Sequence, residues 1–371
     1  MNIDNLDGIL RLDNEKMFEM VYTWPKLIEL IMAESISIPS QIDIGKYHLN
    51  YKNTFSQVMI TGMGGSAISG DYTRTYFENS AELPIFVQRN YTLPKFVNET
   101  TLIIIVSYSG NTEESISGLM SAIESGCPTI CIGSGGKLEE FCLKNELPFF
   151  KIPSGYQPRA SFPLLFFPII KILDSINITT LKSSEIQEVI LQLKTMRETI
   201  KPEILIAENQ AKQIALKLHN KIPVIWSPFL CVANRFKCQI NENSKQLALA
   251  EELPEFNHNH IVGFEDLALD HNFIVIAFRF PSEIPNVSLR FEITKEIIGK
   301  KVKIVDIVIK EGNLLSQLIT STYLGDYISM YLALLNNQNP STVDSIDYLK
   351  SQMEKRGNTQ STLMKKLDSL S

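Results

Sequence analysis

Two short runs of glycine, serine and threonine follow apolar stretches of the sequence. The first, SYSGNTEES at 107–115, comes directly after TLIIIVS and opens what has the pattern of a helix. Ser107, Ser109 and Thr112 supply hydroxyl donors, and Gly110 lets the backbone approach a ligand closely. Because a helix N-terminus offers unpaired N–H groups and a partial positive charge, this run could hold a phosphate group. The alternative is that these hydroxyl residues only cap the helix.

The second run, TGMGGSAISGD at 61–71, also follows a strand pattern and opens a helix pattern. Its glycines give a tight turn, and Gly65 and Ser66 stand at the expected helix start. The spacing does not fit G-x-G-x-x-G, and no acidic strand end follows about 20 residues later, as a dinucleotide site requires. Ligands bind beyond the carboxyl ends of strands in open α/β sheets. The two runs therefore indicate a small phosphorylated ligand rather than a dinucleotide.

The elements around these runs alternate between strand and helix. QVMITGMG, PIFVQRN, TLIIIVS, PTICIGS and PFFKIP have the pattern of buried strands, with amphipathic stretches between them. Such alternation predicts a mostly parallel sheet covered by helices. The alternation restarts with KIPVIWS as a strand and PFLCVANRFKCQINENSKQLALAEE as one helix, followed by strands FIVIAFRF and VKIVDIVI around a helix. The last long helix is NLLSQLITSTYLGDYISMYLALLNN.

This pattern predicts an α/β protein with two doubly wound, mostly parallel-sheet domains, a helical N-terminal arm and a C-terminal helix. The expected divisions are a helical arm at 1–50, a first sheet domain at 51–180, a long linking helix at 181–220 and a second sheet domain with the C-terminal helix at 221–371. A length of 371 residues agrees with two domains.

The composition limits the class of protein. The net charge of -6 gives no reason to expect a nucleic acid or an anionic membrane as partner. The polar, acidic N-terminus does not resemble a signal peptide, and FPLLFFPIIKIL is too short to span a bilayer. The five cysteines show no metal spacing, so we expect them to be small core residues in a reducing cytoplasm.

Five motifs occur along the chain in this order: GMGGSAISGD, SYSGNTEE, GYQPRA, NENSK and PEFNHNH. Together they resemble the sugar isomerase (SIS) fold and, within it, the bifunctional phosphoglucose/phosphomannose isomerases. SYSGNTEE alone is typical of the fold, whereas the order of all five motifs is far more specific. The resemblance implies that both sheet domains are of the SIS type. It also implies interconversion of glucose 6-phosphate and mannose 6-phosphate with fructose 6-phosphate, a reaction of carbohydrate metabolism in glycolysis and gluconeogenesis.

The resemblance also assigns residues. Its phosphate-binding positions fall on Gly65, Ser66, Ser107, Ser109 and Thr112. Its catalytic positions fall on Arg159 in PRA, Glu242 in NEN, His258 in NHN and Lys350 in DYLK. A small hydroxyl residue before that last helix is Thr342, with Ser341 as the alternative. The family usually has an acidic residue after NHN, whereas this chain has His260.

Isomerisation through a cis-enediol moves one proton between C2 and C1 of the sugar. It needs a carboxylate base, an acid that opens the ring and a cation near the developing enediolate. Glu242 is the expected base, His258 and Lys350 open the ring, and Arg159 stabilises the enediolate. Each of these residues also has a simpler interpretation as a surface charge or a structural ion pair.

The resemblance implies that the ring-opening histidine comes from the neighbouring subunit, and hence a homodimer with shared sites. His258 and His260 lack a nearby third ligand, so neither a metal nor another cofactor is predicted. Two other functions remain open. A non-catalytic SIS-type protein that senses sugar phosphates would carry the same hydroxyl run but would not need the base. An amino-sugar-phosphate isomerase is the other, although the chain offers no amidotransferase half.

Overall fold

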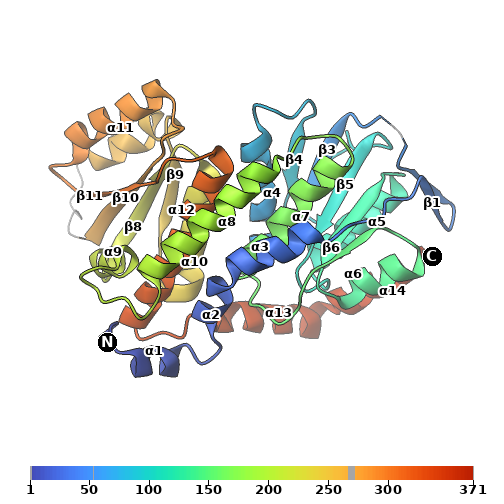
Figure 1. Ribbon diagram of the computed structural model, residues 1–371. Coiled ribbons are helices and arrows are strands. Elements are labelled where there is room, and N and C mark those ends of the chain that lie inside the picture. The colour runs from blue at the N-terminus through green and yellow to red at the C-terminus, as the bar shows by residue number, and fades with distance from the viewer. Residues whose placement is uncertain (1, 53, 266–271, 371) are drawn as a thin grey trace. The chain divides into compact units, whose positions relative to one another are not determined.

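The computed structural model describes residues 2–52, 54–265 and 272–370, and these residues divide into two compact units (Figure 1). The four-stranded unit comprises Met1–Pro25 and Lys182–Thr342. The five-stranded unit comprises Lys26–Leu181 and Val343–Ser371. Each is an α/β unit with a parallel sheet, as the sequence predicts. The expected divisions at residues 50, 180 and 220 stay predictions.

The sheet of the five-stranded unit has the order β4-β3-β5-β6-β7, and all its pairings are parallel. Its strands are β3 (Gln57–Thr61), β4 (Ile85–Gln88), β5 (Thr101–Val106), β6 (Thr129–Gly133) and β7 (Phe149–Lys151). Its main helices are α4 (Gly64–Phe77), α5 (Glu113–Glu124), α6 (Gly136–Lys144) and α7 (Phe162–Ser175). Every residue of β5 is buried, because helices cover both faces of the sheet. The five predicted strands are confirmed.

The sheet of the four-stranded unit is also parallel, with the order β11-β10-β8-β9. Its strands are β8 (Ile222–Ser227), β9 (Leu249–Glu252), β10 (Phe273–Arg279) and β11 (Lys303–Val308). Its helices include α10 (Leu230–Ser244), α11 (Pro285–Ile298) and α12 (Leu314–Leu335). Two short 3-10 helices, η1 (Glu255–His258) and η2 (His260–Phe264), follow β9.

Two predictions for this unit are wrong. The stretch from PFLCV to LAEE is not one helix: α10 ends at Ser244, where Lys245 adopts a left-handed conformation, and LAEE pairs with β8 as strand β9. The long helix expected at 181–220 is two helices, α8 (Ser183–Ile200) and α9 (Gln210–Leu218). Pro202 disfavours helical backbone at the residue before it, and Asn209 caps the start of α9 by accepting a hydrogen bond from the Lys212 N–H at 3.1 Å.

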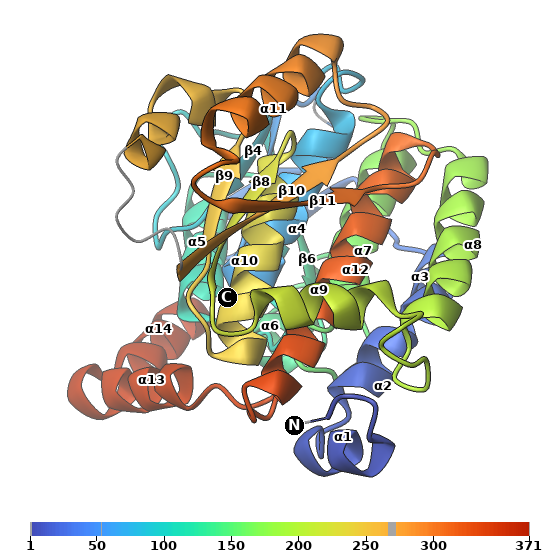
Figure 2. The same cartoon turned by 90° about the vertical axis from the view of Figure 1, so that its left-hand side faces the viewer.

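The two faces of the four-stranded sheet carry different elements. On one face, Val224, Trp226, Val275 and Ala277 pack with Phe291 of α11 and with the segment after β9. There the rings of Trp226 and Phe256 lie 4.7 Å apart. On the other face, Phe236 of α10 packs on Phe278 of β10 at 5.7 Å. Figure 2 shows α11 and α10 on different sides of the strands. The segment with His258 and the helix with Glu242 therefore belong to opposite faces.

The ends of the chain are mainly helical. The predicted arm contains α1 (Leu6–Leu12), α2 (Met17–Tyr22) and α3 (Trp24–Ala33). Its last ten residues differ, because β1 (Gln41–Ile44) and β2 (Tyr47–Asn50) form an antiparallel hairpin. The C-terminal segment forms α13 (Asp344–Gly357) and α14 (Thr359–Asp368).

Other sequence expectations concern cysteines and membranes. All five cysteines are free thiols; the four buried ones are confirmed as core residues, whereas Cys238 is half-buried. In the described parts of the chain, no helix combines the length and apolarity needed to cross a membrane. The same residues contain no cluster of three or more His, Cys, Asp or Glu side chains arranged to hold a metal ion.

Candidate active site

The hydroxyl run 107–112 connects β5 to α5 at the carboxyl end of the five-stranded sheet. The loop between β3 and α4 lies beside it, because β3 and β5 are paired neighbours. The two loops touch: a Cβ added to Gly62 would lie 2.8 Å from the Val106 carbonyl oxygen. The chain passes from β3 to β4 on one side and then to β5 on the other, so the strand order reverses here. Ligands of open α/β sheets bind at such switch points.

The hydroxyl groups of this run bond to one another and to the backbone of the loop. The buried Ser107 hydroxyl donates to Thr112 Oγ1 at 3.1 Å and accepts from the Gly110 N–H at 3.2 Å. The exposed Ser109 hydroxyl accepts from the Asn111 N–H at 3.3 Å. Thr112 stands at the N-cap of α5 but makes no side-chain capping bond. Capping therefore does not account for the Thr112 side chain, and the phosphate-binding role of this run stays a prediction.

Gly110 fixes the shape of the loop. Its φ of 68° lies in the left-handed region, and an added Cβ would lie 1.8 Å from the Gly135 carbonyl oxygen. The Gly110 carbonyl in turn accepts from the Leu138 N–H at 3.0 Å. The loop is thus held against the start of α6, and only glycine fits at its centre.

The second predicted loop begins α4. Gly64, with φ of 50°, leads into the helix, whose first N–H groups have no partner within the helix itself. A Cβ added to Gly65 would lie 3.3 Å from the Pro158 carbonyl oxygen. The glycine–serine start of α4 therefore lies against the turn that carries Arg159, whose side chain is only 5% exposed. The five-stranded unit thus brings together Gly65, Ser66 and Arg159.

Lys350 also belongs to the five-stranded unit. It lies on α13, a helix with no buried residue, and its own side chain is exposed. This position fits an ordinary surface lysine, and the part of Lys350 in ring opening stays a prediction.

Glu242 lies in the last turn of α10, in the four-stranded unit, and is half-buried. The residues after it attach that turn to α12. Asn243 Nδ2 donates to Ser329 Oγ at 2.8 Å, and the Ser244 hydroxyl donates to the Ser329 carbonyl at 2.8 Å. The polar residues of NENSK therefore fix the end of the helix at which the predicted base stands.

His258 and His260 have different surroundings. His258 is exposed at the end of η1. His260 Nδ1 lies 2.6 Å from Glu251 Oε1, and its ring lies 5.3 Å from that of Phe256. His260 is thus held by a carboxylate and an aromatic ring, while His258 is presented to the outside of the chain.

Glu242 and His258 of one chain lie far apart. The first residue of α10, Leu230, donates its N–H to Glu252 Oε1 at the end of β9. Glu242 lies about 18 Å further along the helix axis, since each helical residue rises ~1.5 Å. His258 ends η1 in the segment after β9, and that segment packs on the opposite face of the sheet. The structure therefore does not bring the predicted base and the predicted acid together within one chain.

The two small hydroxyl residues before α13 differ in exposure. Ser341 is buried, with 2% of its surface exposed, whereas Thr342 is half-buried. Thr342 is thus the more accessible of the two positions that the sequence leaves open.

Two regions match known protein families. Residues 55–137 match the SIS domain, and residues 207–353 match the bacterial phospho-glucose isomerase C-terminal SIS domain. A bifunctional phosphoglucose/phosphomannose isomerase of Caldicellulosiruptor bescii is 37% identical, over 91% of this chain and 98% of its own length. One from Aquifex aeolicus is 35% identical, over 84% of this chain and 94% of its own length. The chain belongs to the bifunctional phosphoglucose/phosphomannose isomerase family.

The fold of this isomerase agrees with a solved structure. A glucose-6-phosphate isomerase like protein from Thermus thermophilus superposes with a TM-score of 0.58 at 16% identity, over 95% of this chain and 99% of that one. At this identity the similarity shows the shared fold. The family and the SIS fold that the five motifs indicate are both confirmed.

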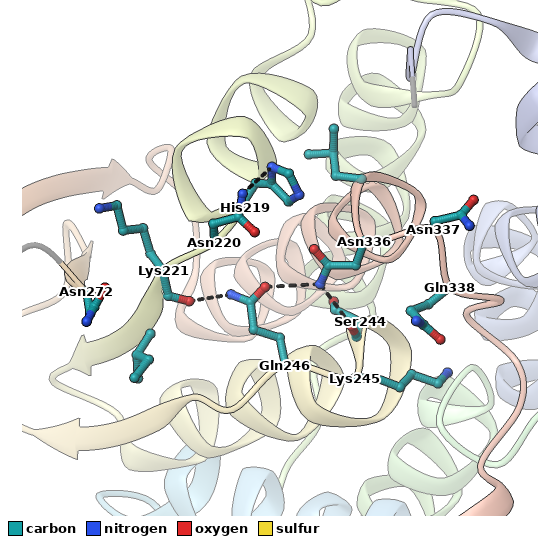
Figure 3. A pocket seen from close by; sticks show the side chains of 12 residues that line it. His219, Asn220, Lys221, Ser244, Lys245, Gln246, Asn272, Asn336, Asn337 and Gln338 are labelled. Atoms are coloured by element: carbon teal, nitrogen blue, oxygen red, sulfur yellow. Dashed lines mark hydrogen bonds between the residues drawn. The ribbon is translucent and has the colours of Figure 1, made fainter.

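The isomerase also has a polar cavity of about 580 Å³ in its four-stranded unit (Figure 3). The helices α9, α10 and α12 all end around it, beside the first residue of β8. Gln246 donates to the Lys221 carbonyl at 2.6 Å, and Asn336 donates to the Ser244 carbonyl at 2.9 Å. These amides therefore pair with backbone groups at the helix ends. The cavity lies at the amino end of the sheet and contains none of the predicted site residues, so we do not assign the substrate to it.

Sequence reasoning missed one residue of this isomerase's histidine segment. Glu251, which contacts His260, stands at the carboxyl end of β9. The acidic pair of LAEE could have indicated Glu251, because acidic residues at the carboxyl end of a strand face the ligand-binding edge of a sheet. It was lost because LAEE was assigned to the end of a helix.

Proposed function

We propose that this isomerase interconverts fructose 6-phosphate with both glucose 6-phosphate and mannose 6-phosphate through a cis-enediol. The observation that carries the proposal is the cradle at the switch point of the five-stranded sheet, with hydroxyl groups and two helix N-termini side by side. Such a cradle suits the phosphate of a sugar phosphate. Membership of the family supplies the reaction class.

The phosphate is assigned to Ser66, Ser107, Ser109 and Thr112. With the open-chain sugar so held, the Glu242 carboxylate takes the C2 proton of the aldose. The electron pair of that C–H bond forms the C1–C2 double bond, and the C1=O electron pair moves onto O1, which becomes the negative oxygen of the enediolate. The proton of the C2 hydroxyl passes to O1, and Glu242 returns its proton to C1, which leaves the hydroxyl on C1 and the ketone on C2. Arg159, which is always charged, stabilises the negative oxygen of the intermediate.

Ring opening is assigned to Lys350 and to His258 of the partner subunit. The separation of Glu242 and His258 on opposite faces of one sheet supports this, because a second copy is then needed to complete the site. We therefore propose a homodimer with shared sites, working in the cytoplasm in carbohydrate metabolism, where glycolysis and gluconeogenesis use these sugar phosphates.

The alternative is a SIS-type protein that binds sugar phosphates without catalysis. The relatives described above are named for enzymes, so none of them favours a sensor. The reaction run from fructose 6-phosphate in deuterium oxide distinguishes the possibilities. Because a proton held on the Glu242 carboxyl group can exchange with solvent before it is returned, an enediol route places at least part of the solvent deuterium label at C2 of the aldose products. Aldose with no deuterium at all would contradict an exchanging carboxylate base, and no aldose at all would favour the sensor.

A further inference from the structure

The helix that carries the proposed base ends in an unusual way. Lys245 follows Ser244 in a left-handed conformation, with φ of 52° and ψ of 38°. Glycine and asparagine are the common residues at this position, because a Cβ is disfavoured there. A lysine in this place therefore calls for a contribution from its side chain.

The ammonium group of Lys245 supplies that contribution. It donates to the carbonyl oxygens of Glu242 at 2.9 Å and Asn243 at 3.3 Å, both in the last turn of α10. It also donates to the carbonyl oxygen of Asn339 at 2.6 Å, in the segment after α12. Figure 3 shows the Lys245 side chain pointing toward the chain beyond Gln338. One cation thus joins two segments that are far apart in the sequence.

Both segments belong to the proposed site. The first is the turn that carries Glu242, and the second leads within three residues to Thr342. Asn339 is itself fixed, since its Oδ1 accepts from the Ser341 N–H at 2.8 Å and its Nδ2 donates to Asn14 Oδ1 at 3.0 Å. The position of Glu242 relative to Thr342 therefore depends on the Lys245 contacts.

We propose that Lys245 is a positioning residue for catalysis: it fixes the backbone of the base Glu242 relative to the Thr342 segment, without touching the sugar. This inference rests on the proposed role of Glu242. A helix end tolerates water on its carbonyls, so the fold does not require the contact. Proton transfer is more demanding, because a displacement of about 1 Å at a reacting group can cost ~100-fold in rate.

The test uses Lys245→Gly, because glycine favours the left-handed conformation and leaves the helix end intact. We expect an unchanged melting temperature, a kcat lower by about 10- to 100-fold and a KM within about threefold of wild type. The ratio of mannose 6-phosphate to glucose 6-phosphate formed from fructose 6-phosphate should also change, since the base meets C2 in a different geometry. Lys245→Arg, which keeps a cation, should restore part of kcat.

Lys237→Met is the matched control, since Lys237 lies on the same helix and its ammonium group donates to Asn234 Oδ1 of that helix at 3.5 Å. It should leave kcat and the product ratio unchanged. A folded Lys245→Gly variant with wild-type kcat and product ratio would overturn the inference and leave Lys245 as a helix cap. If Glu242 is not the base, the result is different: the Glu242→Gln variant then converts fructose 6-phosphate at the wild-type rate.

Discussion

At the residue scale, Glu242 carries the proposed proton transfer. Glu242→Gln keeps the shape of the side chain and removes its basicity. Loss of a general base lowers turnover by about 10²- to 10⁴-fold, and sugar-phosphate binding should survive. The measurement is kcat together with exchange of the C2 proton with solvent. The matched control is Glu296→Gln, a glutamate exposed on α11.

The outcome separates a base from a surface glutamate. If Glu242→Gln still exchanges the C2 proton at the wild-type rate, Glu242 is not the base. A parallel loss in Glu296→Gln would show that the assay responds to the charge of the protein rather than to the site.

Burial raises the pKa of Asp13 from 3.8 to about 6, although its carboxylate accepts the N–H groups of Met17 at 2.7 Å and Phe18 at 3.0 Å. Because the folded state holds this proton more tightly than the unfolded state, the contribution of Asp13 to stability is complete below pH 4. It is lost as the pH rises through about 6, by up to ~3 kcal/mol for a shift of two units.

Asp13→Asn cannot ionise, so its free energy of unfolding should lack this decline. Urea unfolding at several values between pH 4 and pH 7 measures the difference from wild type. Asp7→Asn, an exposed change on α1, serves as control and should follow the wild-type curve. Parallel curves for wild type and Asp13→Asn would contradict the prediction.

At the element scale, the hydroxyl loop before α5 should decide phosphate affinity. Ser109→Ala with Thr112→Val removes two hydroxyl groups and keeps the glycine that shapes the loop. KM for fructose 6-phosphate should rise at least about tenfold, because each hydrogen bond to a charged group contributes ~1.5–3 kcal/mol. Ser125→Ala, at the other end of the same helix, should leave KM unchanged. An unchanged KM in the double variant would exclude the loop as the phosphate site.

The sequence predicted the elements whose pattern is strong. The β5 segment TLIIIV is apolar after its first residue, Thr101, and its strand is confirmed. The glycines and hydroxyl residues after it predicted the loop. By contrast, LAEE is short and half polar, and its pairing with β8 is a long-range contact that local pattern does not contain. The left-handed Lys245 that separates it from α10 was missed for a similar reason, since lysine rarely marks a helix end of this kind. The hairpin Gln41–Asn50 likewise depends on pairing across a turn.

At the scale of the whole molecule, the proposed dimer predicts complementation. Glu242→Gln and His258→Ala are each expected to be nearly inactive. In a mixed dimer, one site receives both altered residues and the other receives neither. Random mixing gives about half mixed dimers, so activity should return to about a quarter of wild type in a symmetric dimer. The measurement is kcat after the two variants are unfolded together and refolded. No recovery, with mixed dimers confirmed by mass, would place both residues in the site of one subunit.

The central claim is that this chain isomerises phosphohexoses at C1 and C2. The most direct test incubates the purified protein with fructose 6-phosphate and quantifies glucose 6-phosphate and mannose 6-phosphate separately. We expect both aldoses to form without added metal or cofactor, and neither to form with Glu242→Gln at a comparable rate. Formation of glucose 6-phosphate alone would restrict the activity to a phosphoglucose isomerase, and formation of neither sugar by the folded wild-type protein would contradict the account.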